Sequence, residues 1–184
     1  MYNYIDVQNV VCLNEEQHKS VNKIFKPWDK RLDASTFVQS GSDVELLIKI
    51  PFTGAVKLKS FCVIGGLDDS SPSNVKLFIN REDIDFSNVE DMKPLQEIKL
   101  ASDNLDGSLE YPVQVFKFGN VHHLTMYFNT NWGAAKTRIT YIGLKGIFTV
   151  ANRDKIVVAN YELKPNPAKN SGIPEANNFT SQIQ

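Results

Sequence analysis

The sequence predicts an all-β protein, an antiparallel β-sandwich of the jelly-roll kind. Short runs in which apolar and polar residues alternate recur along the 184-residue chain. Polar connections that carry Gly and Pro separate these runs at the spacing of a sandwich. Eleven Phe and six Tyr also favour strands, because aromatic side chains pack well on pleated surfaces. A chain of this length most economically forms one domain.

The first two runs, residues 45–51 and 56–65, are expected to form a hairpin. Pro51 has no N–H to donate and should end the first strand, and Thr53 and Gly54 supply the turn. In the second run, alternation assigns four side chains to the core and two to water: Val56, Leu58, Cys62 and Ile64, against Lys57 and Lys59.

Further alternating runs follow to the end of the predicted sandwich. They lie at 75–80, 94–100, 109–118, 121–128, 137–149 and 155–163. Helix signals are confined to residues 14–25, where Asn14 could cap a turn or two. From Lys164 onward the chain is rich in Pro, Asn and Ser. We therefore expect a domain over 1–164 and a flexible C-terminal tail over 165–184.

Composition excludes several classes of partner. The net charge is −1 and the pI about 6.3, so no bulk charge attracts nucleic acid or membrane. No apolar run approaches the roughly 18 residues of a membrane helix, and no signal peptide precedes the domain. Cys12 and Cys62 lie outside any C-x-x-C motif and are expected to be small buried side chains. These features indicate a monomer in the reducing cytoplasm or the nucleus.

No pattern indicates catalysis or a cofactor. The chain lacks the G-x-S-x-G, P-loop and G-x-G-x-x-G motifs. Asp68 and Asp69 share a loop with three serines, and their hard oxygen ligands could hold calcium. The same residues satisfy backbone N–H groups in turns, and we favour that role. His122 and His123 are adjacent in a strand and face opposite sides, so a zinc site is not expected.

Two tryptophans are candidates for partner binding. Trp28 in KPWDK and Trp132 in NTNWGAAK both lie in predicted loops beside Lys and polar residues. Such indoles anchor protein partners or stack on sugar rings, or they fold over the open end of a sandwich and seal its core. With their neighbours, they give four candidate partner-binding residues: Trp28, Lys30, Asn131 and Trp132.

The chain as a whole resembles the PITH domain, the proteasome-interacting thioredoxin domain. The stretches that carry the resemblance are FKPWDKR (25–31), ELLIKIPFTGAVKLKSF (45–61), GLDDSSPSNVKLFIN (66–80), FGNVHHLTMYF (118–128), YIGLKGIF (141–148) and NYELKPNPA (160–168). The resemblance extends from Tyr4 to about Ala168 and implies a jelly roll similar to Doc-type and galactose-binding-like domains. No thioredoxin domain, C-x-x-C motif or His-, Gly- and Cys-rich leader is found, so the sequence resembles the single-domain form of the family.

Two functions follow as expectations. The resemblance implies a non-enzymatic protein-interaction module that associates with the regulatory particle of the 26S proteasome, and the tail could add a second contact. The redox chemistry of two-domain members belongs to the absent thioredoxin domain. The alternative, from fold analogy, is a binding domain for a carbohydrate or another small polar ligand. Trp132, Asn129 and Asn131 are its candidate residues.

Overall fold

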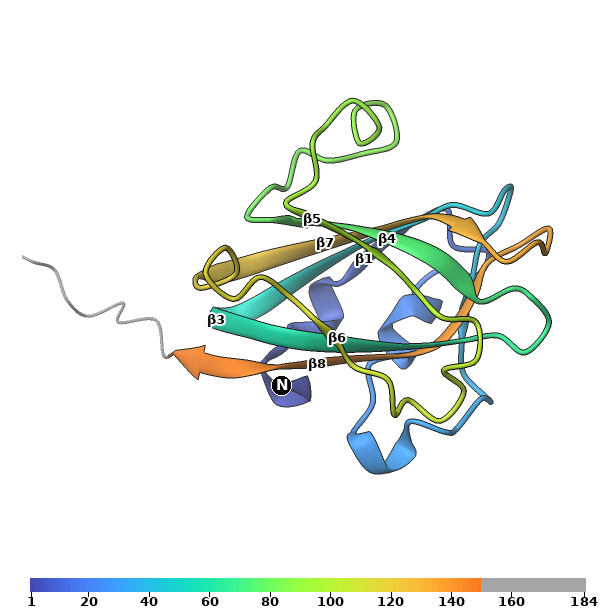
Figure 1. Cartoon of the computed structure of the whole chain (residues 1–184), viewed down its shortest axis with the longest axis horizontal. Helices are drawn as coiled ribbons and strands as arrows, with labels where there is room; N and C mark the ends of the chain where they lie inside the picture. The colour runs from blue at the N-terminus through green and yellow to red at the C-terminus, as the bar shows by residue number, and fades with distance from the viewer. Residues whose placement is uncertain (150–184) are drawn as a thin grey trace, which may run out of the picture. The chain divides into compact units, whose positions relative to one another are not determined.

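The computed structural model describes residues 1–149 and confirms the antiparallel all-β sandwich (Figure 1). The strands are β1 Val11–Leu13, β2 Val38–Gln39, β3 Leu46–Gly65, β4 Pro72–Ile79, β5 Gln96–Lys99, β6 Tyr111–Pro112, β7 Val121–Asn131 and β8 Arg138–Thr149. Four short 3₁₀ helices accompany them: η1 Tyr2–Tyr4, η2 Val7–Asn9, η3 Ser20–Lys23 and η4 Trp28–Lys30. The strand expected at 155–163 and the tail expected at 165–184 lie outside the described residues.

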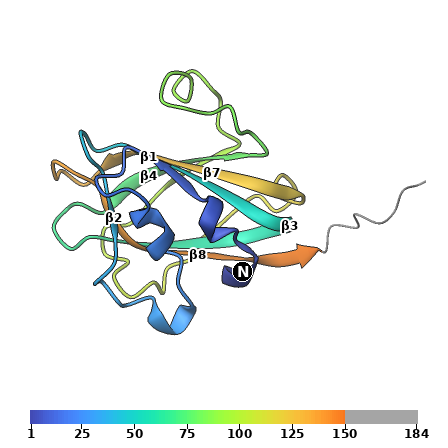
Figure 2. The same ribbon diagram turned by 180° about the vertical axis from the view of Figure 1, so that it is seen from behind.

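The longest strand, β3, belongs to both layers of the sandwich. The strand order is β2-β8-β3-β7-β4-β5, with β1 and β6 also paired to β3. The first part of β3 pairs with β1 and β7, and its second part pairs with β8 and β6. Strands β7, β4 and β5 therefore lie in one layer and β8 and β6 in the other, as Figure 1 shows. Seen from behind, η1 lies by β3 and β8, both of which it contacts (Figure 2).

The predicted hairpin over 45–65 is wrong, because these residues form the single 20-residue strand β3. Pro51 does not end the strand. It lies where the ladder to β7 shifts register, a place at which a missing N–H costs no ladder bond. Its carbonyl oxygen still accepts a hydrogen bond from the Asp6 N–H at 3.0 Å. Thr53 and Gly54 lie within the strand and do not reverse the chain.

A second irregularity in β3 changes which side chains enter the core. The pairing with β8 shifts between Leu58 and Ser60, so the alternation changes phase there. Val56 and Leu58 lie in the main core as expected, but the next core side chains are Phe61 and Val63. Cys62 and Ile64, expected in that core, instead pack with Tyr141 on the opposite face. Lys57 and Lys59 are exposed, as predicted.

The main core lies between the two layers and takes most of its large side chains from β3, β4, β7 and β8. A second, smaller cluster covers the outer face of β3, β7 and β4 beneath the 80–93 connection. It consists of Leu47, Phe78, Ile84, Val89 and Tyr127. This connection covers part of that outer face, and the part lined by Asn74 and Asn129 stays uncovered.

Two further expectations need correction. The segment 14–25 contains only the 3₁₀ helix η3, and Asn14 is not its cap but adopts φ 67° and bonds to the carbonyl oxygen of Glu45. The run 109–118 forms strand only at Tyr111–Pro112, and residues 115–117 form a turn in which the Lys117 N–H donates to the Gln114 carbonyl. Among residues 1–149, no helix is long and apolar enough to cross a membrane.

Candidate functional site

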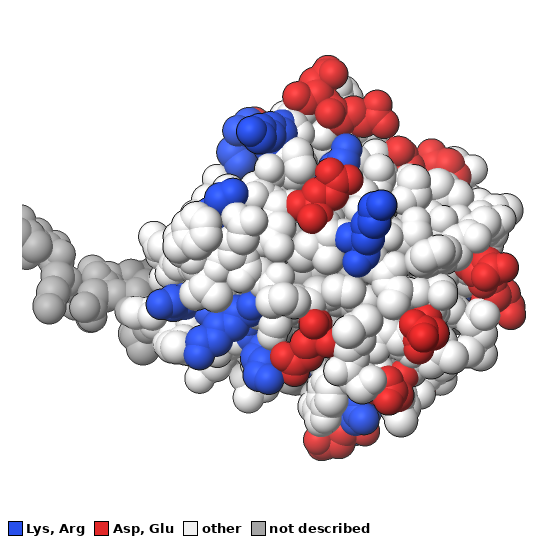
Figure 3. Space-filling view, viewed as in Figure 1, with Lys and Arg blue, Asp and Glu red and all other residues white. Residues whose placement is uncertain are grey.

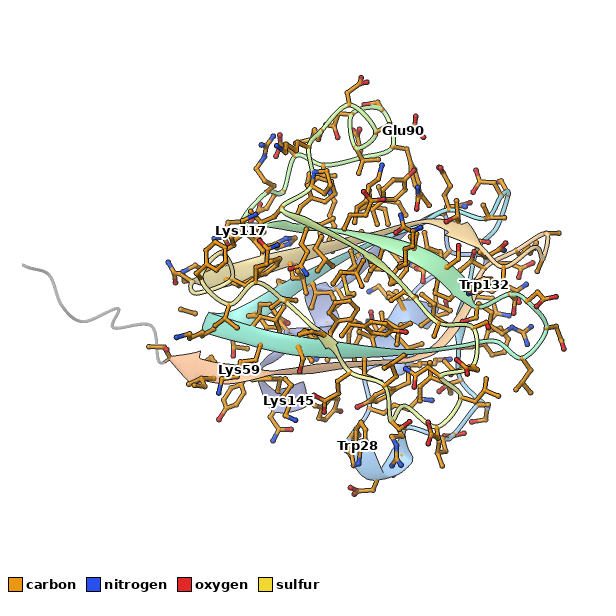
Figure 4. The ribbon with its side chains drawn as sticks, viewed as in Figure 1. Trp28, Lys59, Glu90, Lys117, Trp132 and Lys145 are labelled. Carbon is orange, nitrogen blue, oxygen red and sulfur yellow. The ribbon has the colours of Figure 1, made fainter. Side chains whose placement is uncertain are left out.

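Two half-exposed tryptophans mark two separate candidate sites. The exposed fraction of Trp28 is 49% and that of Trp132 is 47%. Trp28 begins η4, whereas Trp132 follows β7 directly. Figure 4 shows the two indoles in different regions of the molecule, Trp28 below the sheet and Trp132 toward the end where β7 finishes. Neither is the fully buried plug that a core-sealing role would require.

Trp28 is held by its neighbours in a fixed orientation. Pro27 precedes η4 with φ −57°, and the Arg31 guanidinium carbon lies 4.2 Å from the centre of the indole ring. Arg31 is itself fixed, because its Nε donates to the Asp106 carbonyl at 2.8 Å. The Tyr141 ring meets the indole edge-on, with the ring centroids 6.3 Å apart. This arrangement supports the indole by cation–π and aromatic contacts while leaving half of its surface in solvent.

Beside Trp28 lies a hollow of about 330 Å³, which we call the Trp28 hollow. Its wall is largely apolar, and its residues come from the N-terminal segment, β3, β8 and η4. The residues that line it include Trp28, Ser60, Cys62, Glu110, Tyr141 and Lys145. The volume and the mostly apolar wall match those of binding pockets in proteins generally.

A charged pair borders this hollow. Lys145 Nζ lies 3.0 Å from Glu110 Oε1, and the Ser60 hydroxyl donates to Glu110 Oε2 at 3.0 Å. The hydrogen bond from Lys145 is the largest cause that lowers the pKa of the Glu110 carboxyl, and the bond from Ser60 is the next. Glu110 is therefore ionised at neutral pH. Figure 4 places Lys145 and Lys59 on the same side of the molecule, where Figure 3 shows blue and red atoms side by side.

The hollow also contains a thiol, that of Cys62. Its Sγ lies 3.4 Å from the carbonyl oxygen of Gly107, and burial raises the pKa of the thiol to about 11. Gly107 adopts φ 74°, a left-handed conformation that glycine takes without strain. A nucleophilic cysteine needs a lowered pKa, so the surroundings of Cys62 favour the unreactive neutral form. Burial raises the pKa of Cys12 as well.

Metal ligands do not gather in the described part of the chain. Residues 1–149 contain no group of three or more His, Cys, Asp or Glu side chains placed to hold an ion. Asp68 and Asp69 are exposed in the connection from β3 to β4. Asp69 adopts φ 52°, and its carbonyl oxygen accepts the Trp132 N–H at 3.1 Å. This bond joins two loops through their backbones and involves no carboxylate, so the role predicted for the Asp68 and Asp69 side chains within their own turn stays a prediction.

Asn131 shapes the turn that presents Trp132. Its Nδ2 donates to the Ala134 carbonyl at 2.9 Å, and its Oδ1 accepts the Gly133 N–H at 3.0 Å. Gly133 adopts φ 130°, which a residue with a Cβ rarely does. Both ends of the Asn131 amide are thus used within the turn. Asn131 positions Trp132 and offers little to a partner.

A second hollow, of about 390 Å³, lies between Trp132 and the outer face of β5, β4 and β7. We call it the Trp132 groove. The polar side chains around it include those of Asn74, Glu97, Lys99, Asn129 and Thr130. Most of the residues that line it have polar side chains, although, as in the Trp28 hollow, more of its surface comes from apolar than from polar atoms. It is formed by three neighbouring strands of one layer.

The four predicted partner-binding residues therefore divide into two pairs. Trp28 and Lys30 share η4, and the exposed ammonium group of Lys30 makes no hydrogen bond or ion pair with any of residues 1–149. Asn131 and Trp132 share the end of β7. Sequence reasoning missed the residues that complete each site, among them Tyr141, Glu110, Asn74 and Glu97. Their only signal was an outward position in an alternating run, which many solvated residues share.

Comparison with solved structures supports the fold. The C-terminal domain of a chitobiase from Bacteroides fragilis aligns over 79% of this chain and 93% of its own, with a TM-score of 0.54 and 15% identity. The CBM32-1 and CBM32-2 domains of Clostridium perfringens ZmpB, solved in complex with GalNAc, align over 78% of this chain and 35% of theirs, with a TM-score of 0.54 and 10% identity. At such identities the likeness shows the jelly-roll fold alone.

Comparison with sequences is more specific. The family model of the PITH domain matches residues 1–165. PITH domain-containing protein GA19395 of Drosophila pseudoobscura pseudoobscura is 46% identical over 168 residues, which are 91% of this chain and 79% of that protein. PITH domain-containing protein 1 of Homo sapiens is 43% identical over the same shares of both chains. This chain belongs to the PITH domain family.

Proposed function

We propose that this PITH domain is a non-enzymatic protein-interaction module that associates with the regulatory particle of the 26S proteasome. Membership of a family named for interaction with the proteasome supports the choice of partner. A rigid sandwich that presents loops and short helices to a large assembly is a common form of binding scaffold. The partner also suits the cytoplasmic and nuclear setting indicated by the sequence.

The Trp28 hollow is the observation that carries this proposal. Tryptophan and arginine are enriched among residues that dominate binding energy, especially beside a pocket that excludes water. Trp28 meets this description, because its indole is half-exposed, packed against Arg31 and adjacent to an apolar hollow of about 330 Å³. We assign the centre of the interface to Trp28, with Lys30 and Lys145 at its polar border.

The chemistry of the hollow favours binding over reaction. The Cys62 thiol is held neutral by burial, and the Glu110 carboxylate is already paired with Lys145 and Ser60. A partner residue that entered the hollow would meet apolar surface and satisfied polar groups. Such surroundings suit an apolar side chain of the partner.

The test is a pull-down of purified 26S proteasome by the full-length chain at near-physiological salt, because salt screens weak charge-driven contacts. We expect saturable binding that requires the regulatory particle and is absent with the isolated 20S core. Trp28→Ala should weaken binding at least tenfold, and Trp132→Ala, a matched substitution of an equally exposed indole, should leave it unchanged. Equal affinity of the Trp28→Ala variant would remove Trp28 from the interface, and no binding by the wild type would exclude this partner.

The tail expected over 165–184 adds a separable component. Because its composition does not support a core, it could order on the partner and so contribute to affinity. A chain ending at residue 164 should then bind the regulatory particle more weakly while its melting temperature stays within about 2 °C, a shift that corresponds to about 0.5–1 kcal/mol. Unchanged affinity would show that the tail takes no part in binding.

A further inference from the structure

The Trp132 groove is a second built site, distinct from the interface proposed around Trp28. Trp132 is pinned at its backbone, since its N–H donates to Asp69 and its turn is closed by Asn131. The indole is therefore presented beside the outward side chains of β4, β5 and β7. A half-exposed aromatic ring at the edge of a groove lined by polar side chains offers a flat apolar platform with hydrogen-bonding groups around it.

The floor of the groove is preorganised by hydrogen bonds across three strands. Asn74 of β4 uses both hydrogens of its Nδ2, one to Glu97 Oε1 of β5 at 2.7 Å and one to Asn129 Oδ1 of β7 at 3.0 Å. Beside it, the Ser73 hydroxyl donates to Thr130 Oγ1 at 2.9 Å. These bonds fix which way each amide and carboxylate points, so a ligand that binds has to order these side chains very little.

The same bonds determine what the groove still has to offer. Asn129 uses its Oδ1 as an acceptor, which leaves its Nδ2 as a donor with no partner among residues 1–149. Asn74 Oδ1 and Glu97 Oε2 are acceptors that likewise have no partner among residues 1–149. The groove thus presents donors and acceptors side by side, which matches a hydroxyl group, because a hydroxyl both donates and accepts.

The charges of the groove point to a neutral ligand. Glu97 and Lys99, two residues apart on β5, contribute one negative and one positive charge, so the groove as a whole carries none. An anionic ligand would face the Glu97 carboxylate, and a cationic ligand would face Lys99. Leu100 is the one large aliphatic side chain among the lining residues, which disfavours an apolar peptide.

We infer that the Trp132 groove binds a neutral saccharide, with the apolar face of a sugar ring on the Trp132 indole and its hydroxyls on Asn129, Asn74 and Glu97. The volume of about 390 Å³ lies in the lower part of the range for small-molecule sites. A single sugar ring, with about a dozen non-hydrogen atoms, can reach roughly millimolar affinity. Asn131, which the sequence suggested as a sugar contact, serves the turn and not the ligand.

The experiment uses the full chain carrying Trp28→Phe, which leaves Trp132 as the sole indole of the chain. Its fluorescence is followed during titration with methyl β-galactoside, methyl β-glucoside, methyl α-mannoside and N-acetylglucosamine, each to 50 mM by design (about fifty times the expected constant). An array of neutral and sialylated glycans extends the search. We expect saturable binding of at least one neutral saccharide, and we expect no binding that depends on a negative charge of the glycan.

Two variants assign the binding to the groove, measured by nuclear magnetic resonance because one of them lacks the indole. Trp132→Ala should lower affinity at least tenfold. Asn129→Asp keeps the shape and the acceptor but replaces the free donor by an acceptor, and it should lower affinity several-fold. This second variant provides the test if Trp132→Ala proves unstable. Trp28→Ala should change nothing. The inference is overturned if no neutral saccharide binds, if binding is limited to acidic glycans, or if Asn129→Asp and Trp132→Ala bind as the wild type does.

Discussion

Asn104 and Leu109 are hydrogen-bonded in both directions. Asn104 Nδ2 donates to the Leu109 carbonyl at 3.0 Å, and the Leu109 N–H donates back to Asn104 Oδ1 at 3.0 Å. The same Nδ2 also donates to the Val63 carbonyl of β3 at 3.0 Å. One buried amide therefore closes the 104–109 loop and joins it to the sheet, behind the Cys62 wall of the Trp28 hollow.

Asn104→Ala should destabilise the protein by about 2–4 kcal/mol, because it leaves several buried backbone groups without partners. The measurement is the free energy of unfolding from urea titration at neutral pH. Asn120→Ala, at an exposed position, is the control and should change that free energy by about 0.5 kcal/mol at most. A loss below about 1 kcal/mol would mean that water replaces the amide at this site.

Gly146 is expected to tolerate no side chain. A Cβ at this position would overlap the carbonyl oxygen of Lys57, which is backbone and cannot move aside. Gly146→Ala should therefore cost about 1–3 kcal/mol of unfolding free energy. Gly119→Ala is the matched control, because a Cβ there comes no closer than 3.8 Å to any other residue than its chain neighbours. Equal stability of the two variants would contradict the close approach of β8 to β3.

His123 should make stability depend on pH. Burial lowers the pKa of its imidazole below the ordinary 6.5, with Glu82 opposing that shift and Lys49 adding to it. The unfolded chain then binds a proton more readily than the folded chain, so unfolding free energy falls as pH decreases through 6.5 toward the folded pKa. His123→Gln should flatten the profile between pH 7.5 and 5 in urea titrations, whereas His122→Gln, at the exposed neighbour, should retain the wild-type slope.

The alternating patterns of the sequence were sufficient for the fold class but not for the path of the chain. Leu46, Ile48 and Ile50 lie in the main core as alternation required. The same pattern could not reveal that Pro51 lies inside a strand, because a local propensity does not specify which partner strand a residue meets. A shift of pairing at a bulge is set by two strands together, and it exchanged the positions of Phe61 and Cys62.

The candidate sites were predictable only in part, and for a related reason. Both tryptophans could be singled out because an indole between polar residues is conspicuous in a sequence. Their partners could not, since Trp28 meets Tyr141 from β8 and the Trp132 groove takes Asn74 from β4. Such neighbours are separated by more than fifty residues, and only the strand order brings them together.

Arg31 controls how Trp28 is presented, and its substitution tests that role. The guanidinium lies over the indole, donates to the Trp28 carbonyl at 3.3 Å and anchors η4 to Asp106. Arg31→Ala should lower unfolding free energy by about 1 kcal/mol through the lost contacts, and should free the ring to move. In a Trp132→Phe background Trp28 is the sole indole, so its motion can be followed by fluorescence anisotropy and its exposure by acrylamide quenching.

Arg31→Lys separates charge from geometry. Lysine keeps the positive charge but has no planar group to stack on the ring, nor the fork that reaches two carbonyls at once. If stacking holds the indole, Arg31→Lys should raise quenching nearly as much as Arg31→Ala does, and both variants should bind the proposed partner more weakly than the wild type. If Arg31→Lys instead shows the quenching and the affinity of the wild type, Arg31 acts through its charge alone. Stacking of the guanidinium on the indole would then not be required for binding.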